Sequence, residues 1–214
     1  MKAFITKQEF MKILKDHQTI MVGGFLTNGT PEKLIDYVLE SNVSDLTIIC
    51  NDAGYPDKGV GKLISAGKVT SLYASHIGTN PVCGDMMNAG LIKVFLIPQG
   101  TLVEQIRAGG AGLGGILTET GKSTIVAEGK QTVTIKGVSY LVEEAIHADL
   151  ALLGGCISDR FGNLIYQATK RNFNPIMAMA ADLTIANVSE VYDEISPEVV
   201  ITPSPLVDYI VVGE

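Results

Sequence analysis

A glycine-rich turn near the start of the chain brings together groups that can bind an anion. It follows a hydrophobic run at residues 19–22 and consists of Gly23, Gly24, Phe25, Leu26, Thr27, Asn28 and Gly29. Thr30 is a good N-cap residue, and Pro31 suits the first position of a following helix. Backbone N–H groups and the positive end of a helix dipole would then face a ligand. A bare strand-to-helix turn predicts the same glycines, so the turn alone leaves both interpretations open.

Polar residues also follow three later hydrophobic runs. Asn51 comes directly after residues 45–50, His76 follows residues 68–75, and Gln99 comes shortly after residues 93–97. Ligands of open α/β sheets bind outside the carboxyl ends of the strands. If the strands are parallel, these residues and the glycine turn converge on one rim. Several polar, glycine-bearing loops that converge indicate a site better than any one of them does.

The elements that would position these residues alternate along the chain. Strands are predicted at residues 19–22, 45–50, 68–75, 93–97 and 149–153, and helices at residues 31–40, 59–66, 82–89 and 101–108. Near-continuous apolar strands separated by helices are typical of a parallel sheet covered on both faces. We therefore predict an α/β fold, with a mostly parallel sheet flanked by helices.

Two segments depart from this alternation. Residues 124–126, 131–135 and 139–142, with a turn at Lys136-Gly137, predict a small antiparallel insertion. The tail predicts edge strands at residues 199–203 and 209–212. No internal repeat or linker is evident, so residues 1–214 are interpreted as one domain.

The segment from residue 100 to residue 121 is unusually rich in glycine. Glycines stand at positions 100, 109, 110, 112, 114, 115 and 121. Regular structure disfavours such a density, which predicts a loop with close backbone packing or ligand approach after a helix over residues 101–108.

Composition excludes several classes of function. The chain has 16 basic and 23 acidic residues, a net charge of −7, and no lysine or arginine cluster, which argues against nucleic acid as a partner. No apolar run approaches the roughly 20 residues of a membrane helix. With 46% hydrophobic and only 18% charged residues, the chain is typical of one that hides part of its surface against a partner subunit.

The cysteines and histidines form no metal-ligand pattern. Cys50, Cys83 and Cys156 are widely spaced and odd in number, which favours reduced, buried thiols in a cytoplasmic protein. The three histidines are equally scattered, so no metal site is expected. The first ten residues do not resemble a signal peptide.

Five blocks of the sequence resemble one family over essentially the whole chain. They read GGFLTNGTPEKLID, NDAGYPDKGVGKLI, ASHIGTNP, PQGTLVEQIRAGGAGLGG and RNFNPIMAMAAD. In these blocks the chain resembles the α subunits of family I coenzyme A transferases, above all bacterial acetate or butyrate:acetoacetate CoA-transferases. The resemblance implies a fold of the CoA-transferase and sugar-phosphate isomerase superfamily and an enzyme with α and β chains, with α2β2 as the expected assembly.

The resemblance also implies a mechanism. In the family, a β-chain glutamate in a Ser-Glu-Asn-Gly motif attacks the acyl-CoA carbonyl, and an acyl-glutamyl anhydride leads to a glutamyl-CoA thioester that the acceptor carboxylate resolves. No Ser-Glu-Asn-Gly occurs in this sequence, so no catalytic nucleophile is assigned to it. The resemblance assigns CoA binding to residues 23–29. CoA is then a substrate, and no resident cofactor is expected.

Supporting roles remain open for several residues. Gln99 is a candidate to hydrogen-bond the partner's glutamate or the acyl oxygen, or it braces a loop. Asn51 and His76 are candidates at neighbouring strand ends, although the anhydride mechanism needs no histidine. Arg107 either pairs with Glu104 or holds an anion. Residues 109–115 form either a mobile lid or a subunit contact.

Two other functions compete with that of a transferase subunit. A non-catalytic CoA-binding module or regulator would keep the fold without a glutamate-bearing partner. A sugar-phosphate isomerase would need acid–base residues of its own, which the five blocks do not suggest. The sequence does not fix the acyl group, because acetate, butyrate and acetoacetate differ by interactions worth only ~1–3 kcal/mol in a pocket.

Overall fold

The computed structural model describes residues 1–213, and within them the largest feature is a nine-stranded, mostly parallel sheet. Its strands are β1 (Ala3–Phe4), β2 (Thr19–Val22), β3 (Leu46–Cys50), β4 (Val69–Ala74), β5 (Lys93–Leu96), β9 (Ala148–Asp159), β10 (Leu164–Tyr166), β11 (Ala181–Tyr192) and β12 (Tyr209–Val212). The order across the sheet is β1-β12-β11-β9-β2-β3-β4-β5, and β10 pairs antiparallel with β9. The predicted α/β fold with a mostly parallel sheet is confirmed.

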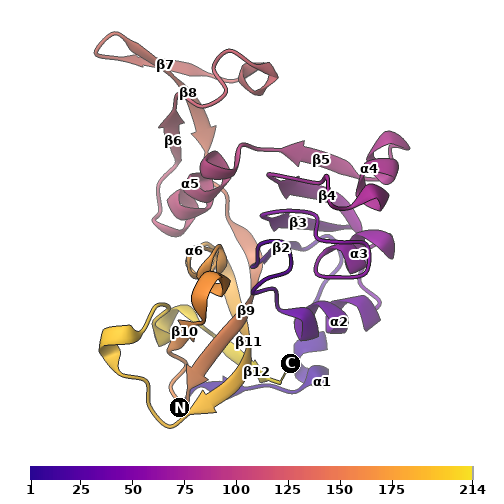
Figure 1. The fold of residues 1–214 in the computed structure, drawn as a ribbon, viewed down its shortest axis with the longest axis vertical. Helices are drawn as coiled ribbons and strands as arrows, with labels where there is room; N and C mark the ends of the chain where they lie inside the picture. Colours follow the sequence, from indigo (N-terminus) through magenta and orange to yellow (C-terminus); the bar gives the residue numbers. More distant parts are fainter. Residues whose placement is uncertain (214) are drawn as a thin grey trace.

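Helices cover both faces of the sheet (Figure 1). They are α1 (Lys7–Met11), α2 (Glu32–Glu40), α3 (Gly61–Ser65), α4 (Pro81–Asn88), α5 (Gln99–Gly110) and α6 (Asn174–Met177). Four short 3-10 turns are η1 (Ile125–Ala127), η2 (Ala168–Arg171), η3 (Pro197–Val199) and η4 (Ser204–Leu206). Helices α1 to α4 pack on one face, and α5 and α6 on the other, which gives three layers.

The alternation of side chains along each strand explains why two cores form. On β2, Ile20 and Val22 point into the core beneath α1 to α4, whereas Met21 points into the core beneath α5 and α6. Leu150 and Leu152 of β9 join the first core, and Ala151 and Leu153 join the second. Strands buried on both faces read as continuous apolar runs, which is why their sequences lack a polar alternation.

A small antiparallel sheet stands away from the main body, in the order β6 (Gly115–Thr118), β8 (Val138–Glu144), β7 (Thr132–Ile135) (Figure 1). The predicted antiparallel insertion is thus confirmed, but its composition differs. Residues 124–126 contribute to the 3-10 turn η1 and not to a strand, and the strand at residues 115–118 was not predicted.

Other predicted elements need correction. The glycine-rich segment is not a loop throughout, because Gly100, Gly109 and Gly110 lie within α5 and Gly115 begins β6. Residues 199–203 form no strand; η3 and an isolated bridge from Thr202 to Leu164 occupy them. Strand β12 lies next to the edge and not at it, because β1 pairs with its outer side.

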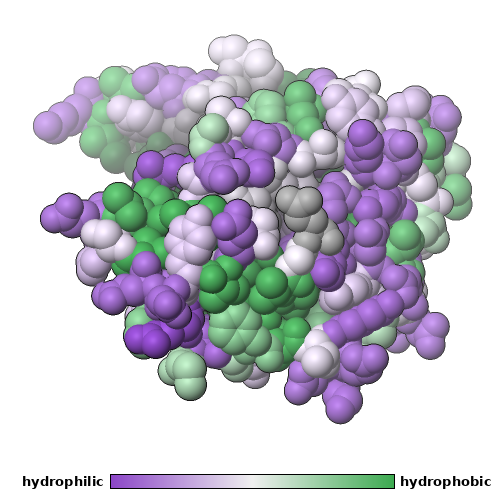
Figure 2. All heavy atoms as spheres, turned by 60° about the horizontal axis from the view of Figure 1, so that its bottom comes forward, coloured by the Kyte–Doolittle hydropathy of each residue, from purple (hydrophilic) through white to green (hydrophobic). Residues whose placement is uncertain are grey.

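The end of the molecule that carries the N-terminal strand exposes apolar side chains. Figure 2 shows this end, where apolar groups gather between polar margins. The strands β1, β11 and β12, the turn after β9 and the 3-10 turn η3 carry large exposed apolar side chains: Phe4, Phe161, Val191, Tyr192, Val199 and Val212. Apolar surface of this kind is typical of faces that bind another protein. No helix in residues 1–213 is long and apolar enough to cross a membrane.

Candidate active site

The glycine turn lies at the point where the strand order of the sheet reverses. Strands β2 and β9 are neighbours; from β2 the chain proceeds through β3, β4 and β5 in one direction, and from β9 through β11 and β12 in the other. Gly23 continues the ladder beyond β2, because its N–H donates to the carbonyl of Leu152 at 3.0 Å. The crevice at such a reversal is where open α/β sheets bind ligands.

The turn itself forms a tight hairpin in a strained conformation. Phe25 and Asn28 exchange backbone hydrogen bonds of 3.0 and 2.9 Å, and the two residues between them have positive φ angles, 45° at Leu26 and 66° at Thr27. Left-handed backbone costs a non-glycine residue ~1–2 kcal/mol. Strain of this kind persists where the surrounding structure over-determines it, and it is concentrated at functional sites.

A second hairpin of the same design follows β3. Tyr55 and Lys58 exchange backbone hydrogen bonds of 3.3 and 3.1 Å. Glycines with positive φ flank both hairpins in the same places, Gly24 and Gly29 in the first, Gly54 and Gly59 in the second. Residues 24–29 and 54–59 therefore form a short repeat, in which a glycine and an aromatic residue are followed by three further residues and a second glycine. The prediction that the chain has no internal repeat missed it. Phe25 and Tyr55 are exposed by 42% and 38%.

Each hairpin is held by an acidic residue that belongs to the other. The carboxylate of Asp52, before the second hairpin, accepts from the N–H of Leu26 in the first at 2.8 Å. In return Glu32, after the first hairpin, accepts from the N–H of Gly59 in the second at 2.9 Å. Glu32 also forms an ion pair of 2.7 Å with Lys62. The two hairpins are thus fixed relative to each other as one unit.

Two asparagines from a distant segment support the first hairpin from behind. Asn172 accepts from the N–H of Gly24 at 3.2 Å and donates to the carbonyl of Asn28 at 2.9 Å. Asn174 is fully buried and donates to the carbonyl of Gly29 at 3.0 Å. Sequence reasoning quoted their RNFNP block but gave neither residue a role. The signal that was present is a pair of asparagines two positions apart before a proline.

Strand β9 leaves room for the first hairpin at a glycine pair. A side chain at Gly154 would lie 2.4 Å from the nitrogen of Pro31, and one at Gly155 would lie 2.6 Å from the Cα of Gly29. The close approach of two backbones explains these glycines, which the sequence prediction placed beyond the end of its strand at residue 153. The predicted helix start also shifts by one residue, because Pro31 is the N-cap and no side chain caps α2.

The structure brings Gln99 and Asn51 together. Gln99 is the first residue of α5, and its Nε2 donates to Oδ1 of Asn51 at 2.5 Å. Asn51 is 2% exposed, and its Nδ2 donates to Asp52 at 2.6 Å. Ser75, at the end of β4, donates to the carbonyl of Asn51 at 2.8 Å. Three strand ends thus meet in one hydrogen-bonded network.

The other candidates lie apart from this network. His76 is exposed, its backbone bridges to Asp52, and its ring lies against Gly78. Arg107 pairs with Glu104 on the surface of α5 at 2.7 Å, and this hydrogen bond raises the pKa of the guanidinium. Neither side chain contacts Gln99 through a hydrogen bond in residues 1–213.

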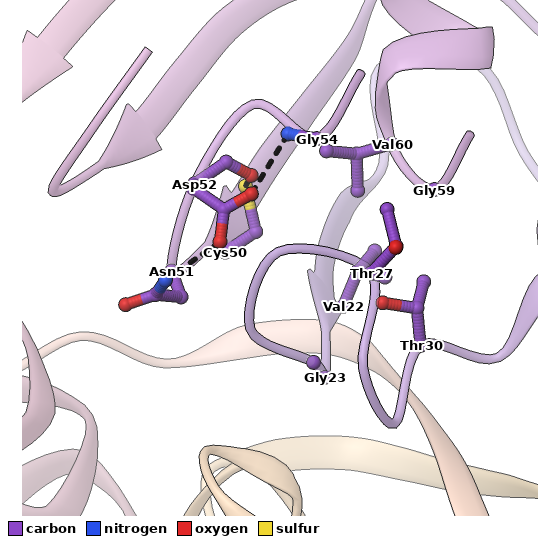
Figure 3. A pocket seen from close by; sticks show the side chains of 11 residues that line it. Val22, Gly23, Thr27, Thr30, Cys50, Asn51, Asp52, Gly54, Gly59 and Val60 are labelled. Carbon is purple, nitrogen blue, oxygen red and sulfur yellow. Dashed lines mark hydrogen bonds between the residues drawn. The ribbon is translucent and has the colours of Figure 1, made fainter. Parts of the chain in front are cut away.

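A narrow cavity separates the two hairpins (Figure 3). Figure 3 shows Asp52 and Gly54 on one side of it and Thr27 and Thr30 on the other. Its volume of about 10 Å³ is enough for about one water molecule. Behind the first hairpin lies a cavity of about 240 Å³, whose lining includes Asn28, Lys170 and Asn187.

Two thiols and one carboxylate in or near this region are poor nucleophiles. Cys50 lines the narrow cavity, and burial raises the pKa of its thiol well above the usual value, so that the thiol stays protonated. Burial likewise raises the pKa of Cys156 to about 12. The carboxylate of Asp52 already accepts three hydrogen bonds. The hydrogen-bond donors and acceptors of the site can position and polarise a ligand.

Solved structures of CoA-transferases share this fold. An acyl-CoA transferase of Escherichia coli O157:H7, solved as a thioester complex with CoA, superposes with a TM-score of 0.85 at 22% identity over 99% of this chain and 47% of that one. Glutaconate coenzyme A-transferase of Acidaminococcus fermentans gives 0.88 at 19% identity, over 99% of this chain and 75% of that one. This chain thus spans about half the length of the first of these proteins.

The sequence comparisons define the family. The acetate CoA-transferase subunit alpha of Escherichia coli K12 is 49% identical over 98% of this chain and 96% of its own length. The acetoacetyl-CoA:acetate/butyrate CoA transferase alpha subunit of Clostridium acetobutylicum is 48% identical over 95% and 94%. The coenzyme A transferase family model matches residues 5–213, and the chain belongs to this family.

Proposed function

We propose that this chain is the α subunit of a CoA-transferase that moves CoA between a short-chain acyl-CoA and a carboxylate, with acetoacetate, acetate or butyrate as the acids. The observation that carries the proposal is the fixed pair of hairpins at the strand-order reversal, in a chain 48–49% identical to two such α subunits. CoA acts as a substrate, and no resident cofactor is required.

Residues 23–29 are proposed to bind CoA. Gly23, Gly24 and Gly29 are buried, whereas Phe25, Leu26 and Asn28 are exposed around them. A ligand on the outer side of the hairpin therefore meets an apolar rim, formed by Phe25 and Leu26, that suits the pantetheine arm. Residues 1–214 would act as one unit in this role.

The reaction requires a carboxylate nucleophile, which we assign to a glutamate of a β subunit. Its attack on the thioester carbonyl places negative charge on the acyl oxygen and releases CoA as thiolate. Gln99 is exposed at the N-terminus of α5, where its side-chain amide donor and the helix dipole would both favour that charge. Asn51 holds Gln99, and His76 lies at the rim as a lesser candidate.

Other features agree with this assignment. The three cysteines are buried and unpaired among the described residues, which suits the reducing cytoplasm that we propose as the location. A binding module without catalysis remains the alternative. Membership of the CoA-transferase family argues against the sugar-phosphate isomerase alternative.

Reconstitution separates the two remaining functions. CoA transfer from acetoacetyl-CoA to acetate is measured with this chain alone, with the β chain alone, and with the two co-expressed. A transferase subunit gives activity only in the mixture. A binding module gives CoA binding by the single chain but no transfer in any mixture, even where a complex forms. Transfer by this chain alone would refute the assignment of the nucleophile to the partner.

A further inference from the structure

Asp52 is buried beside the proposed CoA-binding hairpin, with 6% of its surface exposed. Its Oδ1 accepts from the N–H of Gly54 at 2.9 Å. Its Oδ2 accepts from the N–H of Leu26 at 2.8 Å and from Nδ2 of Asn51 at 2.6 Å. Figure 3 shows the hydrogen bonds of Asp52 with Gly54 and Asn51. One carboxylate therefore joins the first hairpin, the second hairpin and the network of Gln99.

The first consequence concerns the orientation of two amides. A carboxylate only accepts hydrogen bonds, so Asn51 must turn its NH2 group toward Asp52. The carbonyl oxygen of Asn51 then points away from Asp52 and accepts from Nε2 of Gln99 at 2.5 Å. Gln99 in turn must present its NH2 group to Asn51, which leaves one N–H of that group for a ligand. The charge on Asp52 thus determines which way round the Gln99 amide is held.

The second consequence concerns the hairpin. Asp52 accepts a hydrogen bond from the N–H of Leu26, the first of the two residues with positive φ in the turn. A hydrogen bond to a charged acceptor is stronger than one to a neutral acceptor. It stabilises a backbone conformation that leucine disfavours by itself. Removal of the charge would weaken the hold on this turn as well as the hydrogen bond from Asn51, because the same oxygen accepts both.

We propose that Asp52 is a positioning residue with two separable effects: through Asn51 it orients Gln99 for the chemical step, and through Leu26 it shapes the hairpin for CoA binding. The proposal rests on the function proposed above. It assigns to Asp52 no contact with substrate and no proton transfer.

The test uses the complex with the β subunit and acetoacetyl-CoA as the varied substrate. Asp52→Asn keeps the size of the side chain and removes the charge; it is expected to lower kcat about 10–100-fold and to raise KM. Asn51→Ala removes the hydrogen bonds that link Asp52 to Gln99 but keeps the one from Leu26 to Asp52, so it is expected to lower kcat and leave KM near the wild-type value. Asp85→Asn removes a charge from an exposed position of α4, outside both hairpins, and is the matched control, with both constants unchanged.

A double-mutant cycle decides whether the effect on kcat passes through Gln99. Gln99→Leu alone is expected to lower kcat, and adding Asp52→Asn to it is expected to lower kcat no further while KM still rises. If the two losses multiply, Asp52 does not act through Gln99 and the proposal is overturned. Equal effects of Asp52→Asn and Asp85→Asn would overturn it as well. If Asp52→Asn fails to fold, Asp52→Ser, which also removes the charge, takes its place in the same cycle with Gln99→Leu.

A second readout does not depend on activity. In ¹⁵N spectra of the wild-type chain, the side-chain NH2 signals of Gln99 and Asn51 report their hydrogen bonds. Asp52→Asn is expected to shift both signals and Asp85→Asn neither. If the wild-type complex transfers no CoA, the proposed function fails; unchanged NH2 signals in Asp52→Asn would separately refute the positioning role.

Discussion

The side chain of Asn174 and the carbonyl of Gly29 are hydrogen-bonded at 3.0 Å although 145 positions separate them in the chain. Oδ1 of the same side chain accepts from the N–H of Gly154 at 3.0 Å. One buried amide therefore binds the proposed CoA-binding hairpin to strand β9 and fixes its position at the reversal of the sheet.

Asn174→Ala should loosen this hairpin. The buried backbone groups of Gly29 and Gly154 would lose a partner, and each such loss costs about 1–3 kcal/mol. We expect the free energy of unfolding to fall by at least that amount in urea titrations, and KM for acyl-CoA to rise in the complex. Asn88→Ala, at an exposed position of α4, serves as the control and should change stability by less than about 0.5 kcal/mol. Equal stabilities of the two variants would contradict the role of Asn174.

Gly23→Ala should be poorly tolerated for a related reason. A Cβ at this position would lie 1.8 Å from Oδ1 of Asn174, so one of the two must move. We expect a lower yield of folded protein and a loss of acyl-CoA binding by calorimetry. Gly84→Ala offers the contrast, because a Cβ at Gly84 meets nothing within 4 Å and alanine favours the helix by about 1 kcal/mol. The melting temperature should fall in the first variant and rise slightly in the second.

Thr27→Gly should separate stability from binding. Thr27 has a φ of 66°, which a β-branched residue disfavours and glycine adopts freely. We expect the free energy of unfolding to rise by about 1 kcal/mol and acyl-CoA binding to weaken, because glycine makes the hairpin more flexible in the free protein. A variant that gained no stability would show that the turn is not strained.

Acid should weaken the fold partly through Asp159. Burial alone raises the pKa of its carboxyl, but hydrogen bonds from Asn163, from the N–H of Ile195 and from the N–H of Phe161 outweigh burial and leave the pKa lowered. A lowered pKa in the folded state means that the ionised group stabilises the fold above the unfolded pKa of about 3.9. This contribution is lost as the pH falls through the folded pKa.

Asp159→Asn tests this dependence. We expect it to reduce the free energy of unfolding by about 2–3 kcal/mol at pH 7, because hydrogen bonds to a charged group are replaced by weaker ones. The difference from wild type should shrink as the pH falls below about 4, where the carboxyl of the unfolded chain takes up a proton, and should be lost once the pH is below the lowered pKa of the folded state. Urea titrations across this range provide the measurement. A difference that stayed constant with pH would exclude an ionised Asp159 as its source.

The sequence predicted much of the sheet because most of its central strands are buried on both faces and read as continuous apolar runs. Strand β11 escaped prediction, since polar residues interrupt it. Two of these polar residues are buried, and each has a hydrogen-bond partner outside its strand. Asn187 donates to the carbonyl of Gly213, and Thr184 donates to the carbonyl of Ala178. Such partners become visible only in the folded chain.

The glycines of α5 show a second limit. Gly109 and Gly110 lie within the helix, and close packing explains why both are glycine. A Cβ at Gly109 would lie 2.0 Å from the carbonyl oxygen of Ile146, and one at Gly110 would lie 2.6 Å from the side chain of Met179. Close tertiary packing, and not chain flexibility, explains them. At the candidate site, strand-end reasoning identified residues 23–29, Asn51 and Gln99, but it missed Asn172 and Asn174, which follow no strand and reach the hairpin only through the tertiary fold.

The central claim is that this chain supplies the binding and positioning groups while its partner supplies the nucleophile. The most direct test is to incubate the complex with acetoacetyl-CoA, reduce it with borohydride, and map the modified residue by mass spectrometry of each chain. We predict that the modification lies on a glutamate of the β subunit and that residues 1–214 are unmodified. A reduced acyl or thioester adduct on any side chain of this protein would contradict the account.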